Sequence, residues 1–127
     1  MRNSKTLLLA SFVSVAGFFA TDAFAQDPAA GEAAFRKCAV CHAIVEGQNK
    51  IGPSLFGVVG RTPGTTDFRY SPAMTAYGTD GNVWDAATLD IYIENPRVVV
   101  PGTRMSFPGV KDADERAALI AYLDTLK

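Results

Sequence analysis

The sequence predicts an all-α fold with long loops, and three features point to it. Apolar stretches with helical spacing begin at helix-capping residues, the segment 43–64 is punctuated by glycine and proline, and no convincing pair of strands is present. The chain has 127 residues, which suggests a single domain. Loops this long in a small domain commonly carry function or cover a cofactor.

The N-terminus predicts a cleaved export signal over residues 1–25. Arg2 and Lys5 precede an apolar run over 6–20, and the segment 23–25, Ala-Phe-Ala, matches a small-x-small cleavage site. The run is short for a membrane span, which needs about 20 residues, although an uncleaved anchor stays open as an alternative. We therefore expect a domain over 26–127 that works in the periplasm without stable membrane insertion.

The charge of the exported chain argues against nucleic acid as a partner. Without residues 1–25 the chain keeps 10 basic and 12 acidic residues, a formal charge of −2. Proteins that bind nucleic acid carry a basic excess instead. The remaining chain of about 100 residues buries only a modest core, so a large apolar cofactor would help to complete it.

The first expected helix covers residues 29–38, because Asp27 is a good cap and Pro28 suits the first helical position. Gly31 is a poor helix former, and it either admits another helix backbone or is an accident of sequence. The segment 43–64 contains repeated glycine and proline, so we expect a loop that wraps around something.

Three further helices follow in the second half of the chain. Ser71-Pro72 predicts a short helix ending near Gly78, followed by a turn over 79–82. Asp85 caps a clearer helix, which Pro96 ends because the residue before a proline avoids helical geometry. A loop is expected over 98–109. The helix after Asp85 has an apolar face formed by Leu89, Tyr92 and Ile93. The last helix begins at a capping box of Asp112 and Glu115, and its apolar face is formed by Leu119, Tyr122, Leu123 and Leu126.

Residues 38–42 read Cys-Ala-Val-Cys-His and contain both cysteines and the only histidine of the chain. The pattern C-x-x-C-H is the attachment signature for c-type haem. Two thiols at this spacing can add to the two vinyl groups of the porphyrin, and the following imidazole can then ligate the iron. The sequence therefore predicts one covalent haem, held by Cys38 and Cys41, with His42 as an iron ligand.

Three other interpretations of this segment are weaker. A structural zinc site needs four ligands, and no second pair of ligands is present. A thioredoxin-like motif follows a strand, whereas the segment before Cys38 is expected to be helical. A local disulfide would leave His42 without a role.

A second axial ligand cannot be histidine within this chain, so methionine is the candidate. Met1 belongs to the signal segment, which leaves Met74 and Met105. Met105 lies in a proline-bounded loop, where scaffolded ligands tend to sit, whereas Met74 lies in an expected helix, where methionine more often fills core space. A thioether ligand raises the reduction potential and suits electron transfer, so the residues favour Met105 without excluding Met74.

Separated motifs, in order, make the chain resemble the small soluble class I cytochromes c of the bacterial, mitochondrial-like type. The resemblance covers nearly all of residues 27–127. It is carried by Gly31-x3-Phe35, Cys38 to His42, the segment 52–57 (GPSLFG), Gly60-Arg61, Tyr70, Trp84, the segments 92–96 (YIENP) and 101–107 (PGTRMSF), and the segment 119–123. Departures are Arg104, where the family has lysine, and the length of the segment between Tyr70 and Trp84.

The resemblance implies a role for each matching residue. Cys38 and Cys41 would form the thioether bonds, and His42 and Met105 would ligate the iron. The Pro53 carbonyl would accept the free N–H of His42, and Tyr92 would point its hydroxyl at the methionine sulfur. The propionates would be surrounded by Arg61, Tyr70, Trp84 and Thr103, and the haem would be packed by Leu55, Ile93 and Phe107. The first helix would cross the last one, with Gly31 and Phe35 against Leu119 and Tyr122. Without the family context, Trp84 and Tyr92 would be core aromatics and Arg61 a surface charge.

These expectations describe a monomeric electron carrier and not an enzyme. Redox partners would be a reaction centre, a terminal oxidase, a cytochrome bc-type complex or a periplasmic dehydrogenase. Two rival classes are an electron-transfer module of a larger dehydrogenase or oxidase, and a ligand-binding haem protein with an open iron site. Partners would dock at a basic ring on the haem edge formed by Lys37, Lys50, Arg97, Arg104 and Lys111, unless the charges are evenly distributed.

Overall fold

A computed structural model describes residues 27–127 of the chain, and over this range the predicted all-α class is confirmed. The predicted signal segment, residues 1–25, lies outside the described residues. No strand occurs within 27–127, and none of the helices there is long and apolar enough to cross a membrane. The helices are α1 (Pro28–Ala39), α2 (Pro72–Thr79), α3 (Ala86–Glu94), α4 (Pro96–Val99) and α5 (Ala113–Asp124).

The predicted helix starts are confirmed by side-chain caps. An N-cap oxygen satisfies one of the backbone N–H groups that a helix leaves unpaired, which contributes about 1 kcal/mol. The capping box at α5 is only half formed, because the Glu115 carboxylate pairs with Lys37 at 2.6 Å. In each of the four caps a side-chain oxygen accepts from a backbone N–H: Asp27 from Ala29 at 3.0 Å, Ser71 from Met74 at 3.1 Å, Asp85 from Thr88 at 2.7 Å and Asp112 from Glu115 at 2.8 Å.

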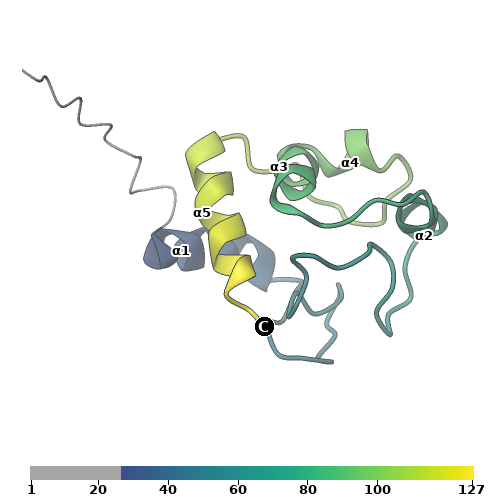
Figure 1. Ribbon diagram of the computed structural model, residues 1–127, viewed down its shortest axis with the longest axis horizontal. Coiled ribbons are helices and arrows are strands. Elements are labelled where there is room, and N and C mark those ends of the chain that lie inside the picture. The colour runs from purple at the N-terminus through teal and green to yellow at the C-terminus, as the bar shows by residue number, and fades with distance from the viewer. Residues whose placement is uncertain (1–26) are drawn as a thin grey trace, which may run out of the picture.

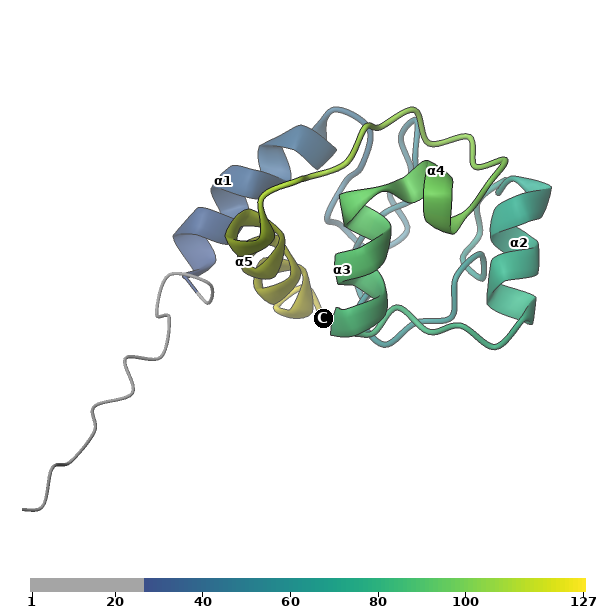
Figure 2. The same cartoon turned by 90° about the horizontal axis from the view of Figure 1, so that it is seen from above.

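Helices α1 and α5 cross in close contact, as Figures 1 and 2 show. A Cβ atom placed on Gly31 would lie 2.3 Å from the Ala118 carbonyl oxygen and 2.6 Å from the Tyr122 Cβ. The rings of Phe35 and Tyr122 lie 5.6 Å apart, and Leu119 is completely buried. Gly31 therefore serves the close approach of two helices, which was one of the two interpretations that the sequence left open.

Helix α3 contacts both α5 and α4, whereas α2 lies at the end of the molecule farthest from α1 (Figure 2). Leu89, Tyr92 and Ile93 form the buried face of α3, as predicted. The loop predicted over 98–109 begins later than expected, because Pro96–Val99 forms the short helix α4. Proline ends α3 but also suits the first position of a new helix, since its missing N–H is not needed there.

The segment between α1 and α2 contains no helix, as predicted, and it is tied to distant parts of the chain. The N–H of Gly57 donates to the carbonyl of Leu126 at 2.7 Å. Backbone hydrogen bonds of 2.9 Å also join Gly60 and Arg61 to Trp84. These bonds hold the loop against the C-terminus and against the segment that leads into α3.

Candidate haem site

The cysteines and the histidine lie on a turn that continues α1. The N–H groups of Cys41 and His42 both donate to the carbonyl of Cys38, at 3.0 Å and 2.9 Å. Residues three and four apart along a helical turn are neighbours on its surface. The two thiols and the imidazole therefore belong to one local surface, and all three residues are partly buried.

The other interpretations of this motif find no support in the geometry. Both cysteines are free thiols, and no group of three His, Cys, Asp or Glu side chains within 27–127 is arranged to hold a metal ion. Burial raises the pKa of the Cys38 thiol to about 11, and Lys37 opposes that shift only in part. A redox-active cysteine has a lowered pKa instead, so this thiol does not resemble a thioredoxin-like nucleophile.

His42 is oriented by the loop that follows it. Its Nδ1 lies 2.7 Å from the Pro53 carbonyl oxygen, which can only accept, so Nδ1 carries the proton and Nε2 keeps a free lone pair. Burial lowers the pKa of His42, although the Pro53 hydrogen bond opposes that shift. The neutral imidazole is the form that ligates iron. The geometry thus presents Nε2 of His42 as a nitrogen donor in a fixed tautomer.

Gly52 makes this arrangement possible and was missed as a site residue by the sequence analysis. A Cβ on Gly52 would lie 2.4 Å from Cε1 and 2.7 Å from Nδ1 of His42. Only a residue without a side chain can therefore pass beside the imidazole. The available signal was a glycine immediately before the proline whose carbonyl was expected to bind the histidine.

The loop that carries Pro53 is held by its own hydrogen bonds. The Ser54 hydroxyl donates to the Val45 carbonyl at 2.6 Å, and the N–H of Ser54 donates to the side chain of Asn49 at 3.1 Å. The N–H of Leu55 donates to the Ala43 carbonyl at 2.9 Å. The carbonyl that orients His42 thus belongs to a firmly closed loop.

Met105 lies beside Tyr92, as the family resemblance implied. The Tyr92 hydroxyl donates to Sδ of Met105 at 3.6 Å, and the N–H of Met105 donates to the Thr103 hydroxyl at 3.2 Å. Burial raises the pKa of Tyr92, with the Thr103 hydrogen bond opposing it, so the hydroxyl stays a donor. Met74 instead belongs to the buried core, with 9% of its surface exposed.

Arg61 lies near both Tyr70 and Trp84, because its backbone carbonyl accepts from the N–H of Trp84 at 2.9 Å and Tyr70 is close enough to act on its guanidinium. Arg61 donates to the Phe56 carbonyl at 3.0 Å, and the Tyr70 hydroxyl is hydrogen-bonded to Thr66. Burial lowers the pKa of Arg61, and Tyr70 opposes this. The Trp84 ring lies 4.7 Å from the ring of Tyr92. The fourth expected propionate donor, Thr103, accepts a hydrogen bond from the N–H of Met105 and keeps its own O–H free to donate.

The residues present fit a covalently attached haem. Two adjacent thiols, an imidazole with a free Nε2 and a pre-oriented thioether are the donor set that this cofactor takes. Ile93 is buried, and Leu55 and Phe107 are partly buried against the same core, which supplies apolar contacts for a porphyrin. The fold and the site therefore define an all-helical haem-binding domain.

Comparisons with known proteins agree with this class. The cytochrome c family model matches residues 28–127. The chain is 47% identical over 103 residues to cytochrome c2 of Rhodopila globiformis, covering 80% of this chain and 94% of that protein. It is 49% identical to the cytochrome cy of Rhodobacter capsulatus, covering 79% of this chain and 49% of that protein. The structure of ferricytochrome c2 from Rhodopseudomonas palustris superposes with a TM-score of 0.73, 36% identity, and coverage of 80% and 99%.

The chain belongs to the cytochrome c family and is a small bacterial class I member. Family membership implies a covalently bound c-type haem. It also makes the chain an electron carrier and not an enzyme.

Proposed function

We propose that the chain is a periplasmic single-electron carrier whose haem iron is ligated by His42 and Met105. The observation that carries this proposal is the hydrogen bond from Tyr92 to the Met105 sulfur. It would orient a second donor to the iron in addition to His42. An iron held by two protein ligands suits electron transfer, whereas a ligand-binding haem protein needs an open position.

Each site residue has a defined task in this proposal. The bound haem supplies the one-electron chemistry. Cys38 and Cys41 hold it covalently, and the Pro53 carbonyl keeps the proton of His42 on Nδ1. The remaining residues surround the porphyrin: Arg61, Tyr70, Trp84 and Thr103 as propionate donors, and Leu55, Ile93 and Phe107 as apolar walls that exclude water.

A redox titration monitored by absorption spectra tests the ligation. We expect a positive potential and, in the ferric protein, the far-red absorption of a thioether-ligated iron. Met105→Ala should abolish that absorption and admit carbon monoxide rapidly to the ferrous iron, while the control Met74→Leu should leave both properties unchanged. Rapid carbon monoxide binding by the wild-type protein would favour a ligand-binding haem protein instead.

The export proposal and the rival of a larger assembly are tested by N-terminal sequencing of the exported protein. Cleavage after residue 25 should leave Gln26 as the first residue. A retained apolar segment would favour a membrane-anchored electron-transfer module. That rival is relevant because the Rhodobacter capsulatus relative is about twice as long as the stretch it shares with this chain.

Partner docking is proposed at the basic ring predicted from the sequence. Lys50, Arg97 and Arg104 are exposed, and within the described residues none of them pairs with a carboxylate. Lys37 differs, because Glu115 neutralises it at 2.6 Å. Lys111 donates to the backbone carbonyl oxygen of Glu94, and this neutral acceptor does not cancel the positive charge of the lysine.

Such a ring would orient an acidic face of a reaction centre, a terminal oxidase, a cytochrome bc-type complex or a periplasmic dehydrogenase. Electron-transfer rates with an isolated partner should fall as ionic strength rises. Lys50→Gln should lower the rate at low salt more than the matched control Lys37→Gln, whose charge is already paired. A rate that does not change with ionic strength would contradict the docking proposal.

A further inference from the structure

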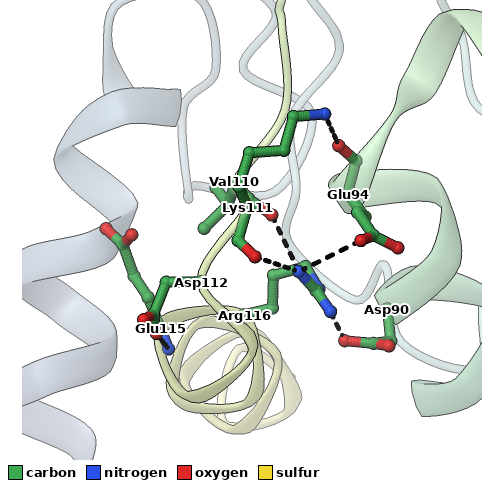
Figure 3. A network of polar contacts seen from close by, with 7 residues as sticks. All are labelled: Asp90, Glu94, Val110, Lys111, Asp112, Glu115 and Arg116. Carbon is green, nitrogen blue, oxygen red and sulfur yellow. Dashed lines mark hydrogen bonds and ion pairs between the residues drawn. The ribbon is translucent and has the colours of Figure 1, made fainter.

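Arg116 places a buried guanidinium where α5, α3 and the loop after Met105 meet (Figure 3). The residue is 6% exposed, although arginine is almost never fully buried unless it is paired. Its Nε donates to Asp90 at 2.8 Å, and its Nη1 donates to the carbonyls of Val110 and Lys111, both at 3.0 Å. Nη1 also lies 3.9 Å from a carboxylate oxygen of Glu94.

The segment that Arg116 holds is also bonded directly to the end of α3. The N–H of Val110 donates to the Ile93 carbonyl at 2.9 Å, and the Lys111 ammonium donates to the Glu94 carbonyl. Gly109 has φ +101°, and a Cβ there would lie 2.1 Å from the Glu94 carbonyl oxygen. The chain after Met105 is thus seated tightly on one turn of α3.

The same turn of α3 carries Tyr92, the hydrogen-bond partner of the Met105 sulfur. Helix α3 therefore contacts the Met105 loop at two places, at Tyr92 and at the carbonyls of Ile93 and Glu94. Arg116 closes this arrangement from α5. A shift of the whole Met105 loop away from α3 would therefore have to break contacts at both places.

We propose that Arg116 is a positioning residue that keeps Met105 in place as the iron ligand, by clamping residues 110–111 to α3. This inference rests on the proposed His42 and Met105 ligation. The planar guanidinium presents five donors in a fixed fork, so one side chain can bind two carbonyls and a carboxylate together. A lysine ammonium keeps the charge but cannot reproduce that geometry.

The test compares Arg116→Lys with two other variants of the haem-loaded protein. Leu123→Ala is the stability control, because Leu123 is 3% exposed and lies about two turns further along α5. Asp90→Asn is the partner control, because it leaves both bonds from Arg116 to the carbonyls in place. The first measurement is the rate at which added imidazole replaces Met105 in the ferric protein. The second is hydrogen exchange at the Val110 amide, with the Leu89 amide in α3 as an internal reference.

We expect Arg116→Lys to accelerate imidazole binding about tenfold, the factor that corresponds to one charge-assisted hydrogen bond. Exchange at Val110 should rise with it, relative to Leu89. Asp90→Asn should stay within about threefold of the wild type, and Leu123→Ala should change both amides together.

Two results would overturn the inference. In the first, Arg116→Lys binds imidazole no faster than Leu123→Ala. In the second, Asp90→Asn binds imidazole as fast as Arg116→Lys. Either result would show that the hydrogen bonds from Arg116 to the two carbonyls do not keep Met105 in place. Failure of the ligation proposal is distinguishable from both. A wild-type ferric spectrum without thioether absorption would reject His42 and Met105 ligation, whatever the Arg116 variants do.

Discussion

His42 and Met105, the two residues proposed to ligate the iron, are held in different ways. His42 is held mainly by the loop that follows it, since Pro53 binds its ring and the N–H groups of Gly52, Ser54 and Leu55 all donate back to residues 41–49. Met105 is held by separate helices, with Tyr92 of α3 at its sulfur and Arg116 of α5 on the segment that follows. The position of His42 depends on local chain geometry, and that of Met105 on helix packing.

The difference indicates where each side can fail. A local loop closed by short-range hydrogen bonds needs little help from the rest of the fold. A segment docked between helices is stable only while those helices keep their positions, so it belongs to the part of a protein that opens more easily. We therefore expect the Met105 side to be released before the His42 side when the contacts of residues 105–111 with α3 and α5 are weakened.

The largest effect should come from Gly109→Ala on the Met105 side. The substitution forces an alanine into φ +101° and places its Cβ 2.1 Å from the Glu94 carbonyl, so the loop must leave α3. We expect a loss of about 3 kcal/mol or more in the free energy of unfolding, measured in urea.

Gly81→Ala is the matched control, because Gly81 has a similar φ of +89° and a Cβ added there would have no neighbouring atom within 4 Å. It should cost only about 1 kcal/mol. Equal losses for the two alanine variants would show that backbone conformation alone, and not docking on α3, holds the Met105 segment.

Gly52→Ala should have a smaller effect, on the His42 side. Its Cβ would overlap the imidazole at 2.4 Å, which displaces the ring and breaks the 2.7 Å contact with Pro53. We expect a loss of about 2 kcal/mol in unfolding free energy, together with a lower ratio of haem to polypeptide in the exported protein.

Ile51→Ala tests the neighbouring position without the overlap, because Ile51 is 78% exposed. It should behave like the wild type in both measurements. If Gly52→Ala matched Ile51→Ala, the local orientation of His42 would not matter for loading.

The smallest effect should come from Tyr92→Phe, which removes one hydroxyl from the Met105 side. The hydrogen bond to sulfur withdraws electron density from the ligand, so its loss should strengthen the bond to ferric iron and lower the reduction potential. The free-energy change should be about 1 kcal/mol or less. An unchanged or raised potential, measured by redox titration, would contradict this role of the hydroxyl.

Much of the fold follows from local chemistry that is visible in the sequence. Asp27, Ser71, Asp85 and Asp112 were expected to start helices, and each caps one, because a capping side chain acts on the N–H groups immediately after it. The haem-attachment segment was equally visible, since thiols and imidazole at this spacing serve one chemistry. Pro96 was only half understood, because a proline that ends one helix can begin another.

The sequence by itself determined the all-α class, the helix starts and the chemistry of residues 38–42, because these depend on neighbours along the chain. Tertiary structure decided which groups from distant segments meet. Gly52 beside His42, Gly109 on α3, the pairing of Lys37 with Glu115 and the burial of Arg116 were not foreseen. Each depends on how two elements approach in space, and that approach is set by packing of the whole core and not by local preference.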